Sequence, residues 1–217
     1  IYEVGAEQTL HFEQIFAAAK TLGIAGKAEF MHTKHGLYLS PDGKKFSTRK
    51  GKTIKLDEVL EEAVEKAKNE SVGIGAIKYY DLLHGVQSNI VFDWDKILSL
   101  EGNSGPYLQY AYARSRSVLA KSNLNFEFRI SNFELNEEEL RVLRWLYRYP
   151  EVVVEAAKRF SPNLLCNFLY ELAQRYNTFY NQCPILENEF RLILTKHVGD
   201  ILRDGLNILG ITALEKM

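Results

Sequence analysis

The sequence has few of the features that define disulfide-rich, metal-binding or membrane proteins. Its two cysteines, Cys166 and Cys183, are too few for a disulfide scaffold and lack the spacing of a metal site, so we expect reduced thiols. No apolar run approaches the length that spans a membrane, and no signal-peptide pattern leads the chain. Internal repeats and low-complexity tracts are also missing. We therefore expect a cytoplasmic protein that does not act at a membrane.

The sequence also lacks an excess of charge of either sign. Its 27 lysines and arginines against 28 aspartates and glutamates leave a formal charge of −1, so any binding to nucleic acid must depend on local patches. The 217 residues suffice for one large domain or two ordinary ones with buried cores. Ile1 already lies in an apolar segment, and we expect a fragment whose N-terminal part is missing.

The most distinctive stretch is a basic loop at residues 40–53. It begins with a Pro-Asp-Gly turn and ends near Gly51, so turn residues rather than a core determine its course. Between the turns lie its cationic and hydroxyl side chains: Lys44, Lys45, Ser47, Thr48, Arg49, Lys50 and Lys52. Such donors suit a polyphosphate, because charge-assisted hydrogen bonds to phosphate oxygens are strong. Phe46 stands where a Walker A loop needs a glycine, which argues against a P-loop and leaves a solvated basic loop as the simpler alternative.

A strand–helix–strand pattern precedes this loop. The predicted elements are a strand over residues 1–4, a helix over about 7–22, and strands 28–33 and 37–39 around a tight turn at 34–36. This order is typical of the end of a βαβ nucleotide-binding half. Ligands of such a fold lie at the carboxyl ends of the strands.

Gly5 and Glu7 follow the first predicted strand at such an end. Gly5 would let the backbone approach a ligand, and Glu7 could accept hydrogen bonds from ribose hydroxyls. The simpler alternative is that Glu7 only complements the dipole at the start of a helix. His32 and His35 have no cysteine or carboxylate cluster beside them, so we expect no protein-bound metal.

The pattern of residues in the middle of the chain indicates a subdomain that packs beneath the basic loop and supports it. We expect a helix from Leu56 with Asp57 as its N-cap, and a second helix from near Ser71. A short strand over residues 89–94 and a short helix over 97–98 follow. Two glycines and Pro106 within residues 101–106 then interrupt the pattern, and we place the domain boundary there.

The helix after Pro106 carries aromatic and hydrogen-bonding side chains that could stack on and bind unpaired bases. They are Tyr107, Gln109, Tyr110, Tyr112, Arg114 and Arg116. Core packing is the alternative for the tyrosines, and for Tyr110 we prefer it.

Everything from Asn136 onward has a helical pattern. Asn136 caps a helix with three glutamates in its first turn, and another helix starts at Ser161-Pro162. That second helix ends in a segment rich in aromatics and amides, residues 175–184, which fits recognition of single-stranded bases. Within it we expect Phe179 in the core. A last helix is predicted over about 187–209.

Two of these stretches resemble arginyl-tRNA synthetases. Residues 45–49, Lys-Phe-Ser-Thr-Arg, resemble the KMSKS loop of class I synthetases, with Phe46 in place of methionine and Thr48 in place of the second lysine. Residues 101–114, Glu-Gly-Asn-Ser-Gly-Pro-Tyr-Leu-Gln-Tyr-Ala-Tyr-Ala-Arg, resemble a hallmark of the family almost letter for letter. The resemblance extends from residue 1 to residue 217.

The resemblance implies an α/β part followed by an all-α part. Residues 1–104 would be the C-terminal part of a class I Rossmann-type catalytic domain, with the KMSKS-like loop at 41–53. Residues 105–217 would be an all-helical DALR-type anticodon-binding domain. The family condenses arginine with ATP, accompanied by Mg²⁺, and transfers the arginyl group to the 3′ end of tRNA(Arg).

The resemblance also implies roles for individual residues. The catalytic residues would be Lys45, Ser47 and Arg49. The ATP-binding residues would be Gly5, Glu7, Gln8, His11, Lys45, Phe46, Ser47 and Thr48. The tRNA-binding residues would be Gln109, Tyr112, Arg114, Tyr176, Asn177, Tyr180, Gln182 and Met217.

The sequence contains no His-x-Gly-His, the HIGH motif of the class. We therefore expect that the chain does not aminoacylate tRNA by itself. We also expect a monomer. Three alternatives stay open: a non-catalytic tRNA-binding paralogue, a related class Ia enzyme such as a cysteinyl one, and a plain helical interaction module.

Overall fold

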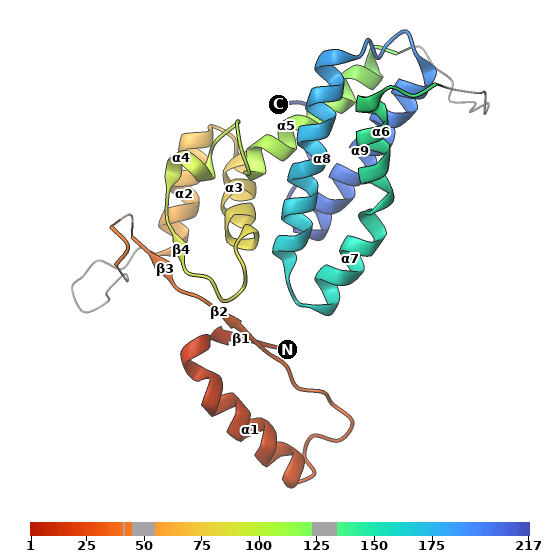
Figure 1. The fold of residues 1–217 in the computed structure, drawn as a ribbon. Coiled ribbons are helices and arrows are strands. Elements are labelled where there is room, and N and C mark those ends of the chain that lie inside the picture. The colour runs from red at the N-terminus through yellow and green to blue at the C-terminus, as the bar shows by residue number, and fades with distance from the viewer. Residues whose placement is uncertain (41, 45–54, 123–133) are drawn as a thin grey trace. The chain divides into compact units, whose positions relative to one another are not determined.

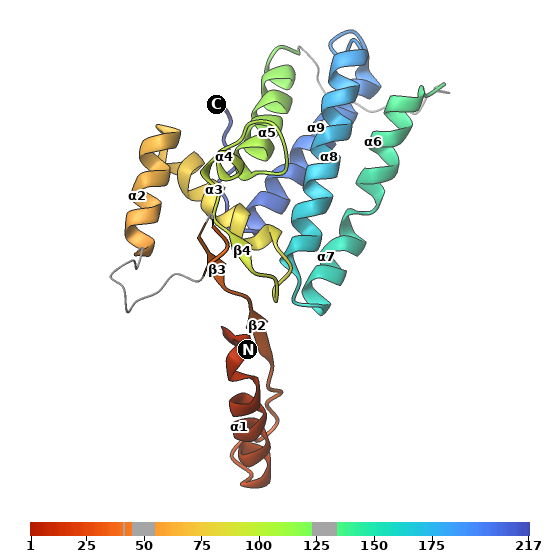
Figure 2. The same cartoon turned by 60° about the vertical axis from the view of Figure 1, so that its left-hand side comes forward.

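The computed structural model describes residues 1–40, 42–44, 55–122 and 134–217. The chain forms two compact units (Figures 1 and 2). Ile1–Ile54 and His84–Asp93 make up the small unit, and Lys55–Leu83 and Trp94–Met217 make up the helical unit.

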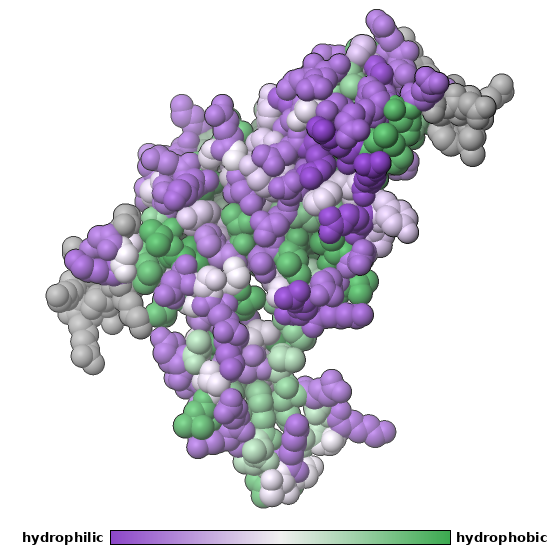
Figure 3. All heavy atoms as spheres, in the orientation of Figure 1, coloured by the Kyte–Doolittle hydropathy of each residue, from purple (hydrophilic) through white to green (hydrophobic). Residues whose placement is uncertain are grey.

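The small unit consists of short strands and one regular helix. Its elements are β1 (Tyr2–Gly5), the 3-10 turn η1 (Ala6–Gln8), α1 (Thr9–Thr21), β2 (His32–His35), β3 (Tyr38–Leu39) and β4 (Ile90–Val91). These elements confirm the predicted first strand and first helix. Apolar side chains such as Leu10, Leu22 and Ile24 are exposed on this unit, which presents pale and green spheres in Figure 3.

The strands pair in parallel, which corrects the predicted turn at residues 34–36. β1 pairs with β2 in the register Tyr2 to His32 and Gly5 to His35. Lys34 and His35 are therefore strand residues. β3 pairs instead with β4, in a second two-stranded sheet. Parallel strands need a long crossover, and α1 supplies it between β1 and β2.

The helical unit contains the rest of the described chain. Its helices are α2 (Leu56–Ala67), α3 (Glu70–Leu83), α4 (Trp94–Ile97), α5 (Gly105–Ala120), α6 (Glu137–Tyr147), α7 (Tyr149–Lys158), α8 (Pro162–Gln182) and α9 (Glu189–Ile208). α8 lies at the centre and contacts α3, α5, α6, α7 and α9 (Figure 2). None of the helices in the described ranges is both long enough and apolar enough to cross a membrane.

Side-chain hydrogen bonds cap the starts of several of these helices, among them α5, α6 and α9. Ser104 Oγ accepts a hydrogen bond from the Tyr107 amide at 3.2 Å, with Pro106 in the first turn of α5. Asn136 forms a reciprocal capping box with Glu139 at the start of α6, and Asn188 caps α9. The predicted cap of α2 is wrong, because the N-cap is Lys55 and Asp57 lies inside the first turn.

The core of the helical unit is made mainly by α5, α8 and α9. Its fully buried side chains include Leu108, Leu169, Leu172, Tyr176, Phe179, Leu192, Val198 and Leu202. The burial of Phe179 confirms the prediction for that residue. A largely buried ion pair joins α6 to α9 in this unit, with Arg191 Nε 2.6 Å from Glu139 Oε1.

Candidate functional site

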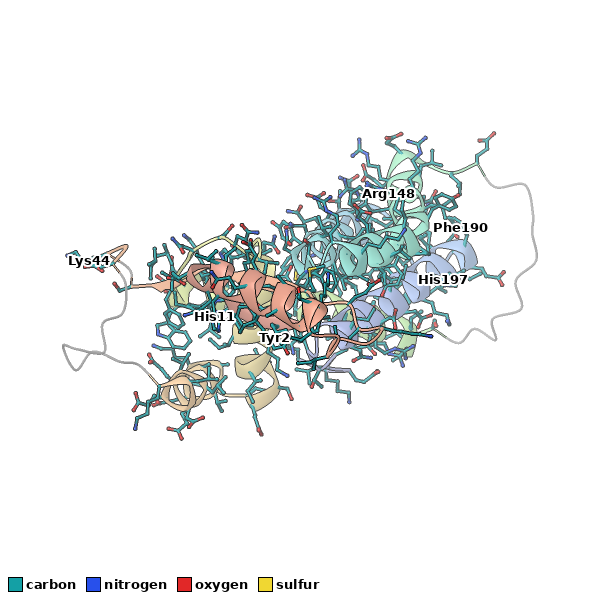
Figure 4. All side chains as sticks on the ribbon, turned by 90° about the horizontal axis from the view of Figure 1, so that it is seen from below. Tyr2, His11, Lys44, Arg148, Phe190 and His197 are labelled. Atoms are coloured by element: carbon teal, nitrogen blue, oxygen red, sulfur yellow. The ribbon has the colours of Figure 1, made fainter. Side chains whose placement is uncertain are left out.

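Four of the predicted ATP-binding residues, Gly5, Glu7, Gln8 and His11, lie together in the small unit. Gly5 is the last residue of β1 and pairs with His35, so it marks the carboxyl edge of this parallel pair. Glu7 and Gln8 follow in η1, and His11 lies in the first turn of α1. The side chains of Glu7, Gln8 and His11 are exposed, and Figure 4 shows His11 on the outside of α1. The edge of a parallel sheet thus carries an acceptor, an amide and an imidazole.

The Glu7 side chain lies close to Gly5. A Cβ atom on Gly5 would lie 2.8 Å from Glu7 Oε2, the end of an exposed and flexible side chain that could move aside. The Glu7 carboxylate therefore folds back over the end of β1. This position is compatible with the predicted contact to a ribose.

The central residues of the predicted signature loop lie outside the described residues: Lys45, Phe46, Ser47, Thr48 and Arg49. The turn that leads into the loop is described. The Gly43 amide donates to Ser40 O at 2.8 Å, and the Ser40 amide donates to Lys44 O at 2.9 Å. Lys44 extends into solvent from this turn (Figure 4). The turn predicted from Pro-Asp-Gly is therefore confirmed.

Asp42 holds this turn closed. Its carboxylate accepts a hydrogen bond from Ser40 Oγ and lies 3.1 Å from the Lys44 ammonium. The hydrogen bond from Ser40 and then the contact with Lys44 lower the pKa of Asp42 from 3.8 to about 2. A charged aspartate thus shapes the entrance to the basic loop at neutral pH.

In the helical unit, α5 presents two different faces. Tyr107, Tyr110 and Arg114 share the face toward α8, because their spacing of three and four residues places them on one stripe. Arg114 Nη1 donates to Asn177 Oδ1 of α8 at 2.6 Å, and Asn177 Nδ2 donates to the Tyr107 hydroxyl at 2.8 Å. Asn177 thus joins two side chains of α5 to α8. Burial of Tyr107 raises the pKa of its hydroxyl.

Arg114 is further held by two aromatic rings. Its guanidinium carbon lies 4.7 Å from the centroid of the Tyr110 ring and 4.9 Å from that of Tyr180. Both rings are exposed, at 38% for Tyr110 and 39% for Tyr180. Cation–π contacts of this length orient a guanidinium as well as attract it. We call Tyr110, Arg114, Asn177 and Tyr180 the arginine–tyrosine cluster.

The opposite face of α5 is covered and serves packing. Gln109 is 0% exposed and Tyr112 is 1% exposed. Gln109 Nε2 donates to Thr212 O at 2.8 Å and to Ser71 O at 3.2 Å, which links α5 to the C-terminal tail and α3. The Tyr112 hydroxyl donates to Glu215 Oε1 at 2.7 Å. Burial, followed by this hydrogen bond, raises the pKa of Tyr112.

These positions change three predictions of tRNA contact. The side chains of Gln109, Tyr112 and Tyr176 are covered by other parts of the helical unit, so in this conformation they have no free surface for a base. Tyr176 is 0% exposed, and burial raises the pKa of its hydroxyl well above the usual value. The preference for Tyr110 as a core residue is wrong, because its ring is exposed.

The remaining predicted tRNA residues are accessible. Asn177 is half-buried in the cluster, Gln182 is exposed at the end of α8, and Met217 is exposed at the end of the tail. None of these residues forms part of a metal site, since no group of three metal-ligating side chains occurs in the described ranges. The described site is thus made of aromatic, amide and guanidinium groups.

Comparisons with protein families place both parts of the chain. Residues 108–217 match the family described as the DALR anticodon binding domain. Residues 1–71 match the family described as tRNA synthetases class I (R), catalytic domain. The arginine–tRNA ligase of Saccharophagus degradans is 39% identical over the whole of this chain, and that of Fusobacterium nucleatum is 40% identical. The chain belongs to the arginyl-tRNA synthetase family.

Solved structures of the family have the same fold. The arginyl-tRNA synthetase of Thermus thermophilus matches 99% of this chain with a TM-score of 0.84 and 30% identity. The enzyme of Plasmodium falciparum matches 100% with a TM-score of 0.83 and 27% identity. These matches confirm the predicted class: a catalytic-domain part followed by DALR-type helices.

The chain spans 42% of the length of the curated relatives it matches and 40% of the Thermus thermophilus chain. Residues 72–107 lie between the two family matches. The boundary predicted between residues 104 and 105 therefore stays a prediction. In the structure, α2, α3 and α4 form part of the helical unit.

Two contacts of this chain were not predicted from the sequence: that of Tyr110 with Arg114 and that of Glu215 with α5. Tyr110 shares a stripe with Tyr107 and Arg114, and this spacing was the available signal that it faces the same neighbours. Glu215 lies in the C-terminal tail and contacts α5 across about a hundred positions of sequence. No local pattern indicates such a contact.

Proposed function

We propose that this chain is part of an arginine–tRNA ligase, which activates arginine with ATP and transfers it to the 3′ end of tRNA(Arg). The observation that carries the proposal is the exposed arginine–tyrosine cluster within the region that matches the DALR anticodon-binding family. A guanidinium fixed between exposed aromatic rings offers stacking and hydrogen bonding to an unpaired base. We propose arginine, ATP with Mg²⁺, and tRNA(Arg) as the substrates.

In the proposed reaction the small unit binds the nucleotide. Gly5, Glu7, Gln8 and His11 would lie beside the ribose and adenine, with Glu7 accepting hydrogen bonds from ribose hydroxyls. Lys45, Ser47 and Arg49 would donate to the triphosphate, and Phe46 and Thr48 would complete the loop around it. Donors placed where charge builds on the leaving pyrophosphate lower the barrier electrostatically.

In the helical unit we propose direct tRNA contacts for the accessible residues. These are Arg114, Tyr180, Gln182 and Met217, with Tyr110 added from the exposed side of α5. Asn177 would hold Arg114 in place. Gln109, Tyr112 and Tyr176 would act only indirectly, by packing α5 and α8 in the correct positions. We further propose that the protein is a cytoplasmic monomer.

A binding titration tests the tRNA part of this proposal. An arginine tRNA transcript and one altered in its anticodon are titrated against the chain at two salt concentrations, because contacts to phosphate make affinity salt-dependent. We expect the altered transcript to bind more weakly, by about tenfold for each lost base contact. Arg114→Gln should reduce the affinity for the arginine tRNA transcript. It should also reduce the difference in affinity between this transcript and the one with the altered anticodon.

Ser117→Ala, on the exposed part of α5, is the matched control and should bind as the unaltered chain does. Equal affinity for both transcripts would contradict sequence recognition by the helical unit.

Aminoacylation assays separate a ligase from a non-catalytic tRNA-binding paralogue. The 217-residue chain lacks a HIGH motif, so we expect no charging of tRNA by the chain alone. In a longer polypeptide that supplies this motif, Lys45→Ala should reduce the rate of arginyl-adenylate formation with little change in tRNA affinity. Absence of adenylate formation in the unaltered longer polypeptide would favour the paralogue, and unchanged formation in Lys45→Ala would contradict the proposed role of Lys45.

A further inference from the structure

The C-terminal tail after α9 is tied to the helical unit by side chains. The Lys78 ammonium donates to Gly210 O at 2.7 Å, and the Gln109 amide donates to Thr212 O at 2.8 Å. Ile211 is buried between these anchors. The tail therefore has a defined course along the covered face of α5 although it forms no helix or strand.

Glu215 makes the last two of these ties. Its Oε1 accepts from the Tyr112 hydroxyl at 2.7 Å, and its Oε2 accepts from Arg116 Nε at 2.7 Å. The carboxylate thus bridges two side chains that lie one helical turn apart on α5. Tyr112 is buried, so its hydroxyl fixes the position of the Glu215 carboxylate, which in turn positions the guanidinium of Arg116.

The arrangement leaves part of the guanidinium open. Only Nε of Arg116 is engaged with a partner among the described residues, and the side chain is 40% exposed. No hydrogen bond of the terminal nitrogens, Nη1 and Nη2, is found among the described residues, so the end of the guanidinium has donors available. Two parallel N–H groups on a rigid plane match the oxygens of a phosphate.

The neighbouring charges on α9 do not occupy these donors. Asp200 accepts from Lys196 at 2.6 Å and from Arg203 at 3.4 Å, and it contributes only a longer-range attraction to Arg116. Arg116 and Glu215 together carry no net charge. The pair therefore contributes little to the long-range attraction of a polyanion. It can contribute instead through the short-range hydrogen bonds that the free N–H groups of Arg116 offer.

We propose that Arg116 binds a backbone phosphate of the tRNA and that Glu215 is a positioning residue for Arg116. This inference rests on the proposed tRNA binding and adds a contact on the side of α5 that carries the tail. Holding a flexible arginine side chain in place before binding reduces the conformational entropy lost when the contact forms.

The decisive variant is Glu215→Ala, because two explanations predict opposite results. If Glu215 were only a surface negative charge, its removal would strengthen binding to a polyanion. If it positions Arg116, its removal weakens binding. We expect about threefold to tenfold weaker binding of an arginine tRNA transcript by the 217-residue chain.

Further variants connect this effect to Arg116. Arg116→Gln should weaken binding by a similar factor and reduce the slope of log affinity against log salt by about one. The double variant should bind no more weakly than Arg116→Gln alone, because the two residues act as a unit. Glu137→Ala is the matched control: it removes an exposed glutamate, paired with Arg141, from α6. It should leave affinity unchanged or slightly stronger.

Melting temperatures of all variants are measured to show that the helical unit is intact. Binding by Glu215→Ala that equals or exceeds that of the unaltered chain would overturn the proposal, and so would an unchanged salt slope in Arg116→Gln. Failure of the unaltered chain to bind the transcript would overturn the proposed function itself. If the unaltered chain binds the transcript and only Arg114→Gln weakens that binding, the proposed function would remain but the phosphate contact of Arg116 would be ruled out.

Discussion

Gln109 and Arg114 lie on the same helix, α5, but on different faces, so their side chains contact different elements. Gln109 donates to backbone carbonyls of α3 and the tail, and Arg114 donates to Asn177 of α8. The first contact is fully buried and holds segments together. The second lies beside exposed rings, where a ligand can reach it. The division of roles within the hallmark stretch thus follows from the helical period.

At the same scale, the pair formed by Glu139 and Arg191 gives a stability prediction. The side chains are 4% and 19% exposed, so Glu139→Ala would leave Arg191 without its partner in a largely dry site. We expect a loss of about 3 kcal/mol in the free energy of unfolding, measured by urea denaturation, to which the lost capping-box hydrogen bond from the Asn136 amide also contributes. Glu137→Ala is the control, because its ion pair with Arg141 lies in solvent and should cost under about 1 kcal/mol.

A loss of similar size in both variants would contradict the importance of burial. Glu137→Ala is a well-matched control for Glu139→Ala, because both glutamates lie in the first turn of α6.

Asp42 gives a prediction for pH. Because its pKa is lowered from 3.8 to about 2 in the folded turn, the charged carboxylate stabilises the turn above pH 3.8. This stabilisation is lost as the pH falls through about 2. A carboxyl NMR titration should show a midpoint near 2 for Asp42. In Ser40→Ala, which removes the main cause, the midpoint should move back toward 3.8.

An unshifted midpoint in the unaltered chain would show that the hydrogen bond from Ser40 is not formed in solution.

At the scale of elements, close approach of α3 and α5 depends on glycine. A Cβ atom on Gly105 would lie 2.8 Å from Gly75 O and 3.0 Å from Tyr79 Cβ. The backbones of the two helices are therefore nearly in contact where α5 begins. This contact explains why the boundary stretch carries a glycine directly before Pro106, where its flexibility is otherwise unfavourable.

Gly105→Ala should consequently destabilise the helical unit. Because the atoms in the way belong to backbone and to a buried tyrosine, we expect a cost of about 1–3 kcal/mol in the free energy of unfolding. Ser117→Ala on the exposed side of α5 is the control and should be neutral or slightly stabilising. Equal stability of the two variants would contradict the close packing of α3 on α5.

At the scale of the whole molecule, the two units differ in how much they can bury. Among its described residues the small unit has two separate two-stranded sheets, and α1 has no buried residue. Isolated two-stranded sheets are marginally stable in water. The helical unit contains the large apolar core and the buried ion pair.

We therefore expect a shortened chain of residues 55–217 to fold by itself. Its main thermal transition, followed by circular dichroism, should lie within a few degrees of that of the 217-residue chain. Its affinity for an arginine tRNA transcript should also be similar if recognition lies in the helical unit. A chain of residues 1–54 alone should show no cooperative transition. Loss of the main transition on removing residues 1–54 would show that the helical unit depends on them.

The sequence alone determined the family, the order of the elements and most helix starts. It did so because caps, helical periods and the stretch at residues 101–114 are local patterns. The helix predicted after Pro106 begins at Gly105, and the helix predicted after Asn136 begins at Glu137. The position of Gly5 at the carboxyl end of the first strand was likewise predicted from the order of strand and helix.

Only the tertiary structure decided which faces are covered and which strands pair. A helical period groups Gln109 with Tyr112 and Tyr110 with Arg114, but it does not say which group the tail will cover. Gln109 and Tyr112 donate hydrogen bonds to residues distant in sequence, Thr212 and Glu215, and these contacts determine which face the tail covers. The parallel pairing of β1 with β2 likewise depends on the path of α1 between them, because a short strand has no preference for its neighbour until the chain brings one to its edge.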